Sequence, residues 1–306
     1  MLRAALLTAS RNRTVRRIVE TAPVSRDVVR RFVAGTSVAD AVAVTATLAG
    51  DGLRISLDHL GEDTTEAGHA DATTKAYVTL LQQLAAHELA TVAEVSVKLS
   101  AVGQALDVSM ARDNAATICA AAAEAGTTVT LDMEDHTTTD STLSTLHELR
   151  AEFPWVGAVI QAYLHRSVDD CRELATAGSR VRLCKGAYKE PASVAYQSRL
   201  DVDRSYVRCL RVLIEGDGYP MVATHDPRLI AIAEKLIVEA GRAHDSYEFQ
   251  MLYGIRPKEQ QRIASTGARM RVYVPYGDEW YGYLMRRLAE RPANVAFFMR
   301  ALATKG

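Results

Sequence analysis

The stretch TTVTLDMEDH, residues 127–136, decides the fold, because a short β-rich apolar run ends there in a cluster of charged side chains. The same arrangement, a short run closed by polar residues, recurs along the chain. Seven further runs have it: LRISLD (53–58), EVSVKL (94–99), VGAVIQAY (156–163), RVRLCKG (180–186), YPMVAT (219–224), YEFQML (247–252) and RMRVYV (269–274). Runs of this length and composition are typical of buried strands.

Between these runs lie segments with apolar residues at helical spacing. Examples are TKAYVTLLQQLAAHEL, NAATICAAAAEAG, DRSYVRCLRVLIEG and PRLIAIAEKLIVEAG, several of which end in a glycine suited to a helix terminus. Eight strand and helix units over about 250 residues predict an α/β fold, a (β/α)₈ TIM barrel. A doubly wound open sheet is the alternative, but no GxGxxG follows the first strand.

Residues 1–50 precede the repeat and are expected to form an N-terminal helical arm, with the catalytic barrel domain at 51–306. The arm contains eight arginines. It is either a contact surface for anionic lipid or a solvated helical arm packed on the barrel, and we favour the second interpretation.

The overall composition excludes several classes of protein. With 36 basic and 37 acidic residues the formal net charge is −1, which argues against nucleic-acid binding driven by phosphate neutralisation. The four cysteines form no CxxC pair, and we expect a reducing, cytoplasmic location. No run of 18 apolar residues and no clear export signal occurs, so we expect no membrane span.

In a barrel the active site lies at the carboxyl ends of the strands. Three cations, Lys98, Arg182 and Lys185, fall at neighbouring strand ends, where burial is costly without a partner. An anionic ligand satisfies all three, whereas a salt bridge from Lys98 to Asp132 or Glu134 is the purely structural alternative. The DMEDH cluster together with His225 raises the further alternative of a metal site, but only this histidine is well placed, and we expect no metal.

Two further motifs suit an anionic ligand. KGAY (185–188) places a glycine where backbone can approach a phosphate closely, next to the Lys185 charge. Arg286 and Arg287, one helical turn after Tyr283, can grip one carboxylate, although an arginine pair on a helix is more often a solvated surface.

Taken together, the sequence motifs at the strand ends resemble the proline dehydrogenase (proline oxidase) family, in its monofunctional bacterial type. They are SLDHLGE, VSVKLS, LDMED, IQAYL, VRLCKGAY, ATHD, YEFQMLYG and YVPYGDEWYGYLMRRLAE, and they occur in order over residues 56–290. The resemblance implies a distorted barrel that binds FAD without a Rossmann fold, with the final helix over the barrel mouth. It also implies oxidation of L-proline to Δ1-pyrroline-5-carboxylate, the first step of proline degradation to glutamate, with electrons passed to a quinone. Quinone use raises peripheral contact with the inner face of the cell membrane as a hypothesis.

The resemblance also implies residue roles. Asp132 and Arg182 correspond to the catalytic pair, with Arg182 near the flavin. Substrate binding falls to Lys98, Arg286 and Arg287 as carboxylate clamp and to Leu252, Tyr273 and Tyr283 as walls for the ring, with Glu62 as a gate that pairs with Arg286. The implied flavin contacts are Met133, Gln161, Arg182, Lys185, Gly186, Ala187, Thr224 and His225.

Two positions depart from the family pattern: Lys189 stands where an aromatic residue is common, and Asp226 stands where Asn is frequent. Three other functions remain open on the residues alone. They are a Schiff-base aldolase using Lys98 or Lys185, a flavin barrel of the methylenetetrahydrofolate reductase type, and a non-enzymatic anion-binding module.

Overall fold

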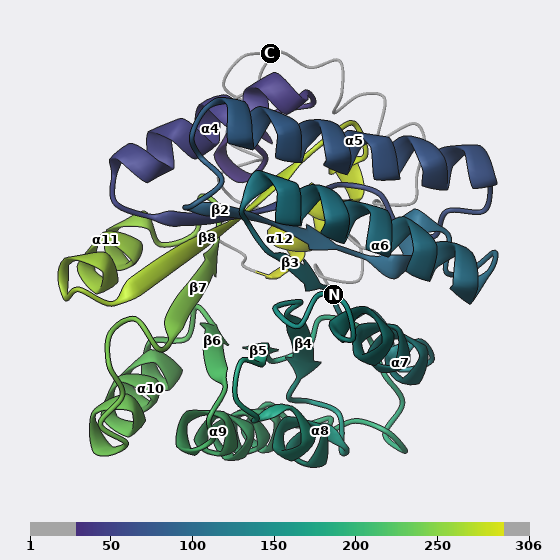
Figure 1. Ribbon diagram of the computed structural model, residues 1–306. Coiled ribbons are helices and arrows are strands. Elements are labelled where there is room, and N and C mark those ends of the chain that lie inside the picture. Colours follow the sequence, from purple (N-terminus) through teal and green to yellow (C-terminus); the bar gives the residue numbers. More distant parts are fainter. Residues whose placement is uncertain (1–28, 291–306) are drawn as a thin grey trace, which may run out of the picture.

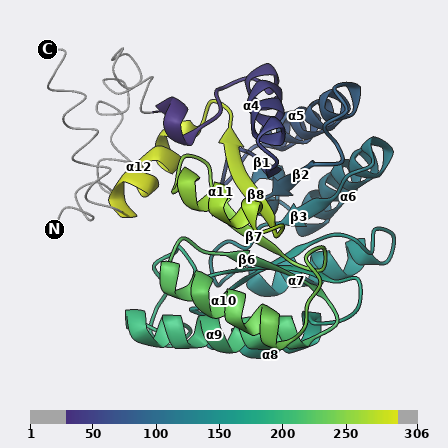
Figure 2. The ribbon, with the colours of Figure 1, turned by 90° about the vertical axis from the view of Figure 1, so that its left-hand side faces the viewer.

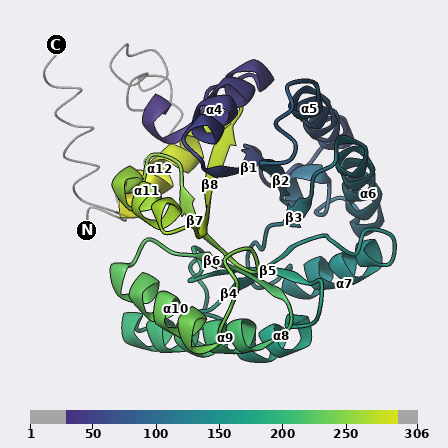
Figure 3. The ribbon, with the colours of Figure 1, turned by 60° about the vertical axis from the view of Figure 1, so that its left-hand side comes forward.

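The computed structural model describes residues 29–290, with side chains as far as Met285. Eight parallel strands form its centre, and helices surround them (Figures 1 and 3). The strands are β1 (Arg54–His59), β2 (Ala93–Val97), β3 (Val129–Leu131), β4 (Ala158–Gln161), β5 (Arg180–Cys184), β6 (Tyr219–Ala223), β7 (Glu248–Leu252) and β8 (Arg269–Tyr276). All eight predicted strands are confirmed, with small differences at their ends.

The helices of the described part follow the strands as the sequence pattern predicts. They are α4 (Val38–Gly50), α5 (Ala67–Ala86), the 3₁₀ helix η1 (Leu99–Val102), α6 (Val108–Ala125), α7 (Thr139–Arg150), α8 (Ser167–Leu174), α9 (Arg199–Glu215), α10 (Pro227–Glu239), α11 (Pro257–Ser265) and α12 (Trp280–Glu290). Asp107 and Asp226 are the N-caps of α6 and α10: their carboxylates accept hydrogen bonds from backbone N–H groups of the first turn.

The strands form a nearly closed barrel. They pair in the order β3-β2-β1-β8-β7-β6-β5-β4, and the two outer strands meet at Gly157. Its N–H donates to the carbonyl of Val129 at 2.8 Å, and its carbonyl accepts from the N–H of Leu131 at 2.9 Å. A Cβ at this position would lie 2.7 Å from Oγ1 of Thr130, so only glycine allows the approach. The predicted (β/α)₈ barrel is therefore confirmed and the open sheet is wrong.

The outer face of the barrel packs against the helices through apolar side chains, and buried hydroxyls fix their position. Tyr77 of α5 is fully buried. Its hydroxyl donates to the carbonyl of Ser96 at 2.7 Å and accepts from the N–H of His59 at 3.1 Å. One helical side chain thus links α5 to both β1 and β2, and it fixes the position of these two strands relative to each other.

The interior of the barrel is polar, whereas most barrels of this class fill theirs with branched apolar residues. Buried inward-facing side chains include Ser56, Ser96, Arg182, Gln250 and Glu248. Buried polar groups are costly unless they are hydrogen-bonded to one another. This interior is therefore a bonded network that joins the two ends of the barrel.

The described part of the arm packs on the barrel. Ser37 is the N-cap of α4, and its side chain forms a capping box with that of Asp40. The helix buries Ala41 and Val42 in the main core. Six of the eight arginines expected on the arm lie in residues 1–28, outside the described residues. The lipid-contact alternative therefore falls mostly outside the described part. Within residues 29–290, no helix combines the length and the apolar character needed to cross a bilayer.

The final described helix, α12, lies beside α11 and β8 in both side views (Figures 2 and 3). Tyr283 and Leu284 join a small apolar cluster with Leu60, which follows β1, and with Leu252, which ends β7. These two residues mark the carboxyl ends of their strands. The helix thus covers part of the barrel mouth, as the resemblance implies.

Candidate active site

The carboxyl ends of the strands bring together the first predicted group, which begins with Lys98. Its ammonium lies 2.7 and 2.8 Å from the two oxygens of Asp58, and the two side chains are 11% and 2% exposed. The structural alternative named Asp132 or Glu134 as the partner, and this was wrong because Asp58 ends the adjacent strand. Burial disfavours the charged ammonium, but the carboxylates of Asp58, Asp132 and Glu62 outweigh it and raise the pKa of Lys98.

Arg182, from β5, lies in the centre of the barrel with its hydrogen-bond donors in use. Its partners come from four other parts of the barrel wall: Gln250 at 2.6 Å from Nε, Asp132 at 2.6 Å and Ser96 at 2.8 Å from Nη1, and Ser56 at 3.2 Å from Nη2. A guanidinium held on all sides cannot change rotamer without breaking several bonds. Its charge is therefore fixed in direction before any ligand binds.

Asp132 connects Arg182 to Tyr273. The Tyr273 hydroxyl donates to Oδ2 of Asp132 at 2.7 Å, and the guanidinium of Arg182 lies 5.2 Å from the centre of the Tyr273 ring. Burial, together with the carboxylates of Asp132 and Asp58, raises the pKa of Tyr273 well above its usual value. The phenol thus stays protonated and donates throughout the physiological pH range. The predicted catalytic pair is in direct contact.

A second group gathers at the ends of β5 and β6. The ammonium of Lys185 lies 2.5 Å from Asp203 and 3.1 Å from Asp226, and Arg228 contacts the same two carboxylates. Two cations and two anions thus balance. Asp226, one of the two departures from the family pattern, serves here both as the N-cap of α10 and as a partner of Lys185.

Gly186 follows Lys185 in a conformation that suits glycine. Its φ is +107°, and a Cβ at this position would lie 2.3 Å from the ring of Tyr163. A side chain at this position would clash with Tyr163, so the turn after Lys185 requires glycine. Ala187 is exposed beside it.

The residues after β6 are bonded to the next strand. Nε2 of His225 accepts from the N–H of Leu252 at 2.9 Å, which leaves Nδ1 as the protonated nitrogen of a neutral ring. Thr224 is buried, and its hydroxyl accepts from the N–H of Asp226 at 3.1 Å. His225, Thr224 and Leu252 therefore share one edge of the mouth.

The remaining predicted residues lie around the same mouth. Met133 and Gln161 are buried, and the Gln161 amide donates to the carbonyl of Glu134 at 2.6 Å. Glu62 acts on Lys98 electrostatically, as its effect on that pKa indicates. Arg286 and Arg287 belong to α12, but their side chains lie outside the described residues, so the clamp and the gate stay predictions.

Several residues that hold this site were given no role from the sequence. Ser56, Asp58 and Gln250 bind Arg182 or Lys98, as described above. Their signal was period-two alternation, since each faces inward on a strand whose neighbours face the helices. Among the described residues, no group of three or more His, Cys, Asp or Glu side chains is placed to bind a metal ion.

Comparison with known proteins agrees with this geometry. The family model described as proline dehydrogenase matches residues 41–300. The chain is 38% identical to proline dehydrogenase 1 of Bacillus subtilis over 305 residues, covering all of both chains. It is 41% identical to a proline dehydrogenase of Deinococcus radiodurans, covering 89% of each.

Among solved structures, proline utilization A from Bdellovibrio bacteriovorus, inactivated by N-propargylglycine, superposes with a TM-score of 0.78 at 27% identity. That match covers 86% of this chain and 32% of the solved one, so this chain spans about a third of that larger protein. The fold, the strand-end residues and full-length relatives all lead to one conclusion: the chain belongs to the proline dehydrogenase family.

Proposed function

We propose that this proline dehydrogenase oxidises L-proline to Δ1-pyrroline-5-carboxylate with bound FAD and passes the electrons to a quinone. The observation that carries the proposal is the contact of Asp132 with Arg182 and Tyr273 beside the Lys98 ammonium. It places a fixed cation, a carboxylate and a phenol donor at one end of the barrel. Those are the groups that an amino acid with an anionic and a cationic end requires.

Lys98 supplies one cation for the substrate carboxylate. Asp58 accepts from its ammonium with both oxygens, which leaves one of the three N–H donors for a ligand. We assign Arg286 and Arg287 to the same carboxylate, because Tyr283, one turn earlier in α12, lies in the apolar cluster with Leu60 and Leu252 at the mouth. Glu62 is the proposed gate to Arg286. Three cations on one carboxylate orient the ring as well as bind it.

The ring is held by Tyr273, Tyr283 and Leu252, which exclude longer and linear amino acids by shape. The negative charge of Asp132 stabilises the positive charge that develops on the ring nitrogen as the C–N bond gains double-bond character. Tyr273, which stays protonated, holds one oxygen of Asp132, and Arg182 holds the other. Asp132 therefore keeps its position without rearrangement during the reaction.

The mouth fits FAD on the chemistry of its donors. Lys185 keeps one N–H beyond its two carboxylate partners, which suits a phosphate oxygen, and the chain turns directly after it at Gly186. The other proposed contacts are Met133, Gln161, Arg182, Ala187, Thr224 and His225. When bound, FAD supplies a two-electron acceptor for the hydride.

The Schiff-base alternative for Lys98 is disfavoured by its surroundings. A nucleophilic lysine needs a lowered pKa so that the neutral amine is populated. The carboxylates around Lys98 raise its pKa instead. Its ammonium therefore stays charged and serves as a binding group.

Proline-dependent quinone reduction tests the function. Purified enzyme is assayed anaerobically with a soluble quinone and either L-proline or NADH. We expect the quinone to be reduced with L-proline as electron donor and not with NADH. A preference for NADH would favour the methylenetetrahydrofolate reductase type of barrel. We also propose that the enzyme is cytoplasmic and makes peripheral contact with the inner face of the cell membrane. A flotation assay tests this contact: if no proline-reduced enzyme is recovered with anionic liposomes, the contact is rejected.

Lys185 tests the cofactor assignment separately. Lys185→Ala removes the proposed phosphate contact, so we expect the affinity of the variant for FAD to be roughly tenfold weaker. The purified variant should therefore contain a smaller fraction of bound flavin. Lys75→Ala, on the exposed face of α5, is the matched control and should keep wild-type flavin content. A Lys185→Ala protein that retains full flavin after dialysis contradicts the role.

A further inference from the structure

A cavity lies at the opposite end of the barrel from the proposed active site. Its volume is about 310 Å³. The lining comes from the amino ends of the strands and the loops before them, with Arg54 of β1, Arg180 of β5, and Arg269 and Arg271 of β8. The amino-terminal face of such barrels ordinarily contributes stability alone. This face differs because it combines a cavity with a concentration of arginines.

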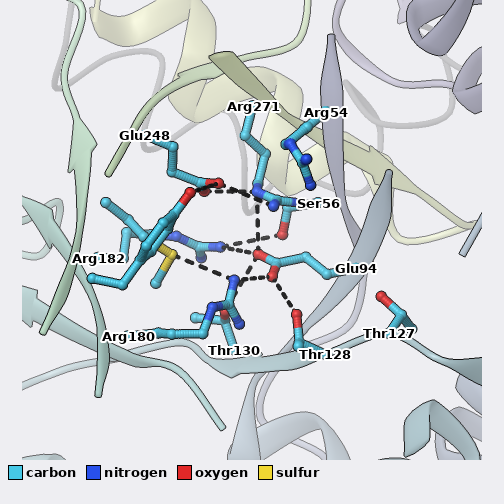
Figure 4. Close-up of polar contacts among 12 residues, drawn as sticks. Arg54, Ser56, Glu94, Thr127, Thr128, Thr130, Arg180, Arg182, Glu248 and Arg271 are labelled. Atoms are coloured by element: carbon cyan, nitrogen blue, oxygen red, sulfur yellow. Dashed lines mark hydrogen bonds and ion pairs between the residues drawn. The ribbon is translucent and has the colours of Figure 1, made fainter. Parts of the chain in front are cut away.

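The charges around the cavity do not balance. Among the described lining residues, four arginines face one carboxylate, that of Glu94. Counting Glu248, which pairs with Arg271 from outside the lining, two positive charges are in excess. Glu94 contacts Arg180 at 2.5 Å and Arg271 at 3.7 Å. Figure 4 shows it between the two. One carboxylate therefore serves two of the four arginines.

Arg271 is bound mainly by Glu248. Its Nε and Nη2 lie 2.7 and 3.0 Å from the two oxygens of that buried carboxylate, as Figure 4 shows, and Glu248 itself does not line the cavity. Arg54 and Arg269, by contrast, have no carboxylate within ion-pair distance in the described part of the chain. Their hydrogen-bond partners there are neutral oxygens: the carbonyls of Thr91 and Asp245 and the hydroxyl of Tyr219. The excess charge thus lies on these two side chains.

Two details indicate that the arrangement is incomplete as it stands. Nη1 of Arg180 is buried and has no hydrogen-bond partner among the described residues. Burial and the neighbouring charges of Arg271 and Arg269 lower the pKa of Arg54. A buried donor without an acceptor and like charges at close range both cost free energy. An anion in the cavity removes both costs.

We infer that this cavity is a binding site for a compact oxyanion with two or more negative charges, a phosphoryl group or a small polycarboxylate. Guanidinium forks match both classes of oxygen ligand in geometry. The volume is near the lower limit of small-molecule sites, which suits a small ligand. The site lies outside the machinery assigned to proline oxidation, and no residue of the proposed substrate or flavin contacts lines it.

The site connects to the catalytic network through Arg182. Nη2 of Arg182 lies 3.6 Å from Glu94, and Nη1 lies 2.6 Å from Asp132 at the mouth. An anion that draws Arg180 and Arg271 toward the cavity changes the field at Glu94 and hence at Arg182. Binding at the amino end is therefore expected to alter the affinity for proline modestly, and proline to alter the affinity for the anion by the same factor.

The test uses flavin-loaded full-length enzyme at constant ionic strength, with inorganic phosphate in one arm and citrate in the other. Calorimetric titration should give saturable binding of one ion per chain. Thermal unfolding should shift upward by about 5 °C when the ion is at a hundredfold excess over its Kd. Tighter binding of phosphate supports a phosphoryl ligand, and tighter binding of citrate supports a polycarboxylate.

The variants Arg54→Gln and Arg269→Gln separate a binding role from a structural one. Each should weaken the ion at least about tenfold, because each removes one charged contact. Without the ion, Arg54→Gln should unfold at the wild-type temperature or above, since the substitution removes a like charge beside Arg271 and Arg269. Arg204→Gln, exposed on α9, is the control and should bind as wild type does.

Two results would overturn the inference. One is the absence of saturable binding of both ions to the wild-type enzyme. The other is unchanged affinity in the double variant Arg54→Gln, Arg269→Gln, with its folded state verified by circular dichroism and by proline turnover.

Discussion

The two ends of the barrel both contain buried charged side chains but balance their charges differently. At the carboxyl end, Lys98 pairs with Asp58, and Arg182 pairs with Asp132, one cation for one anion. At the amino end, four arginines line a cavity with the single carboxylate of Glu94, and Arg54 and Arg269 have no carboxylate partner among the described residues. The first arrangement holds groups in position for a reaction. The second leaves positive charge for a ligand to neutralise.

The difference shows that balanced and unbalanced charges serve different purposes. A buried pair contributes little net stability, because desolvation offsets most of the attraction. What it provides at the mouth is position, since each charge fixes the rotamer of its partner. An unbalanced cluster instead stores unfavourable electrostatic energy that ligand binding releases.

The strongest test of this contrast is Arg182→Met, which removes the cation shared by the two ends. The substitution leaves Asp132 without its ion-pair partner and weakens the field at Glu94, so we expect destabilisation of about 3–5 kcal/mol. Because the position of Asp132 is lost, kcat/KM for proline should fall about 10³-fold or more. Urea unfolding and steady-state kinetics measure the two effects. Arg112→Met, on the exposed face of α6, is the control, and equal loss in both variants would show that the network has no special role.

Removing one cation of the proposed clamp should have a smaller effect. In Lys98→Met and Arg286→Met we expect KM for proline to rise about 10- to 100-fold, because a charged contact to the substrate carboxylate is lost. Flavin content should not change, as these residues act on substrate. Steady-state kinetics with the flavin absorbance recorded in parallel decides, and a wild-type KM in either variant removes that residue from the clamp.

Tyr273→Phe keeps the ring over Arg182 and removes only the hydroxyl that donates to Asp132. A hydrogen bond to a charged group contributes about 1.5–3 kcal/mol, so kcat/KM should fall roughly 10- to 100-fold. Tyr206→Phe is the matched control, because its buried hydroxyl bonds backbone carbonyls behind β5 and β6. If the control loses as much activity as Tyr273→Phe, the effect is one of folding.

Acid stability tests the amino end through Glu94. Burial alone favours the neutral acid, but Arg180, Arg271 and Arg182 outweigh it and hold the pKa of Glu94 far below its usual range. The unfolded chain takes up this proton near pH 4.3 and the folded chain does not, so stability falls as the pH drops below about 4.3. Glu94→Gln should make that fall shallower by up to about 1.4 kcal/mol per pH unit.

Urea unfolding between pH 5 and pH 3 measures the slope, with Glu215→Gln, on the exposed end of α9, as the control. An unchanged slope in Glu94→Gln would mean that the arginines do not act on this carboxylate as the geometry indicates.

Much of this architecture was predictable because its signals are local. The charged ends of short apolar runs, such as Asp132 after Leu131, identified both the strands and the mouth. The partner of Lys98 was not predictable, because Asp58 lies 40 residues away and its position depends on strand register. The amino-end cavity was missed for the same reason, since Arg54 and Arg271 are far apart in sequence and meet only when β1 pairs with β8.

The visible spectrum of the purified enzyme under anaerobic conditions tests the central claim most directly. We predict the absorbance bands of oxidised flavin, which bleach on addition of L-proline and not on addition of NADH. A flavin spectrum indifferent to proline would contradict the assignment of Lys98, Asp132 and Arg182 to proline oxidation. A protein that stays colourless after incubation with FAD would contradict the proposed cofactor itself.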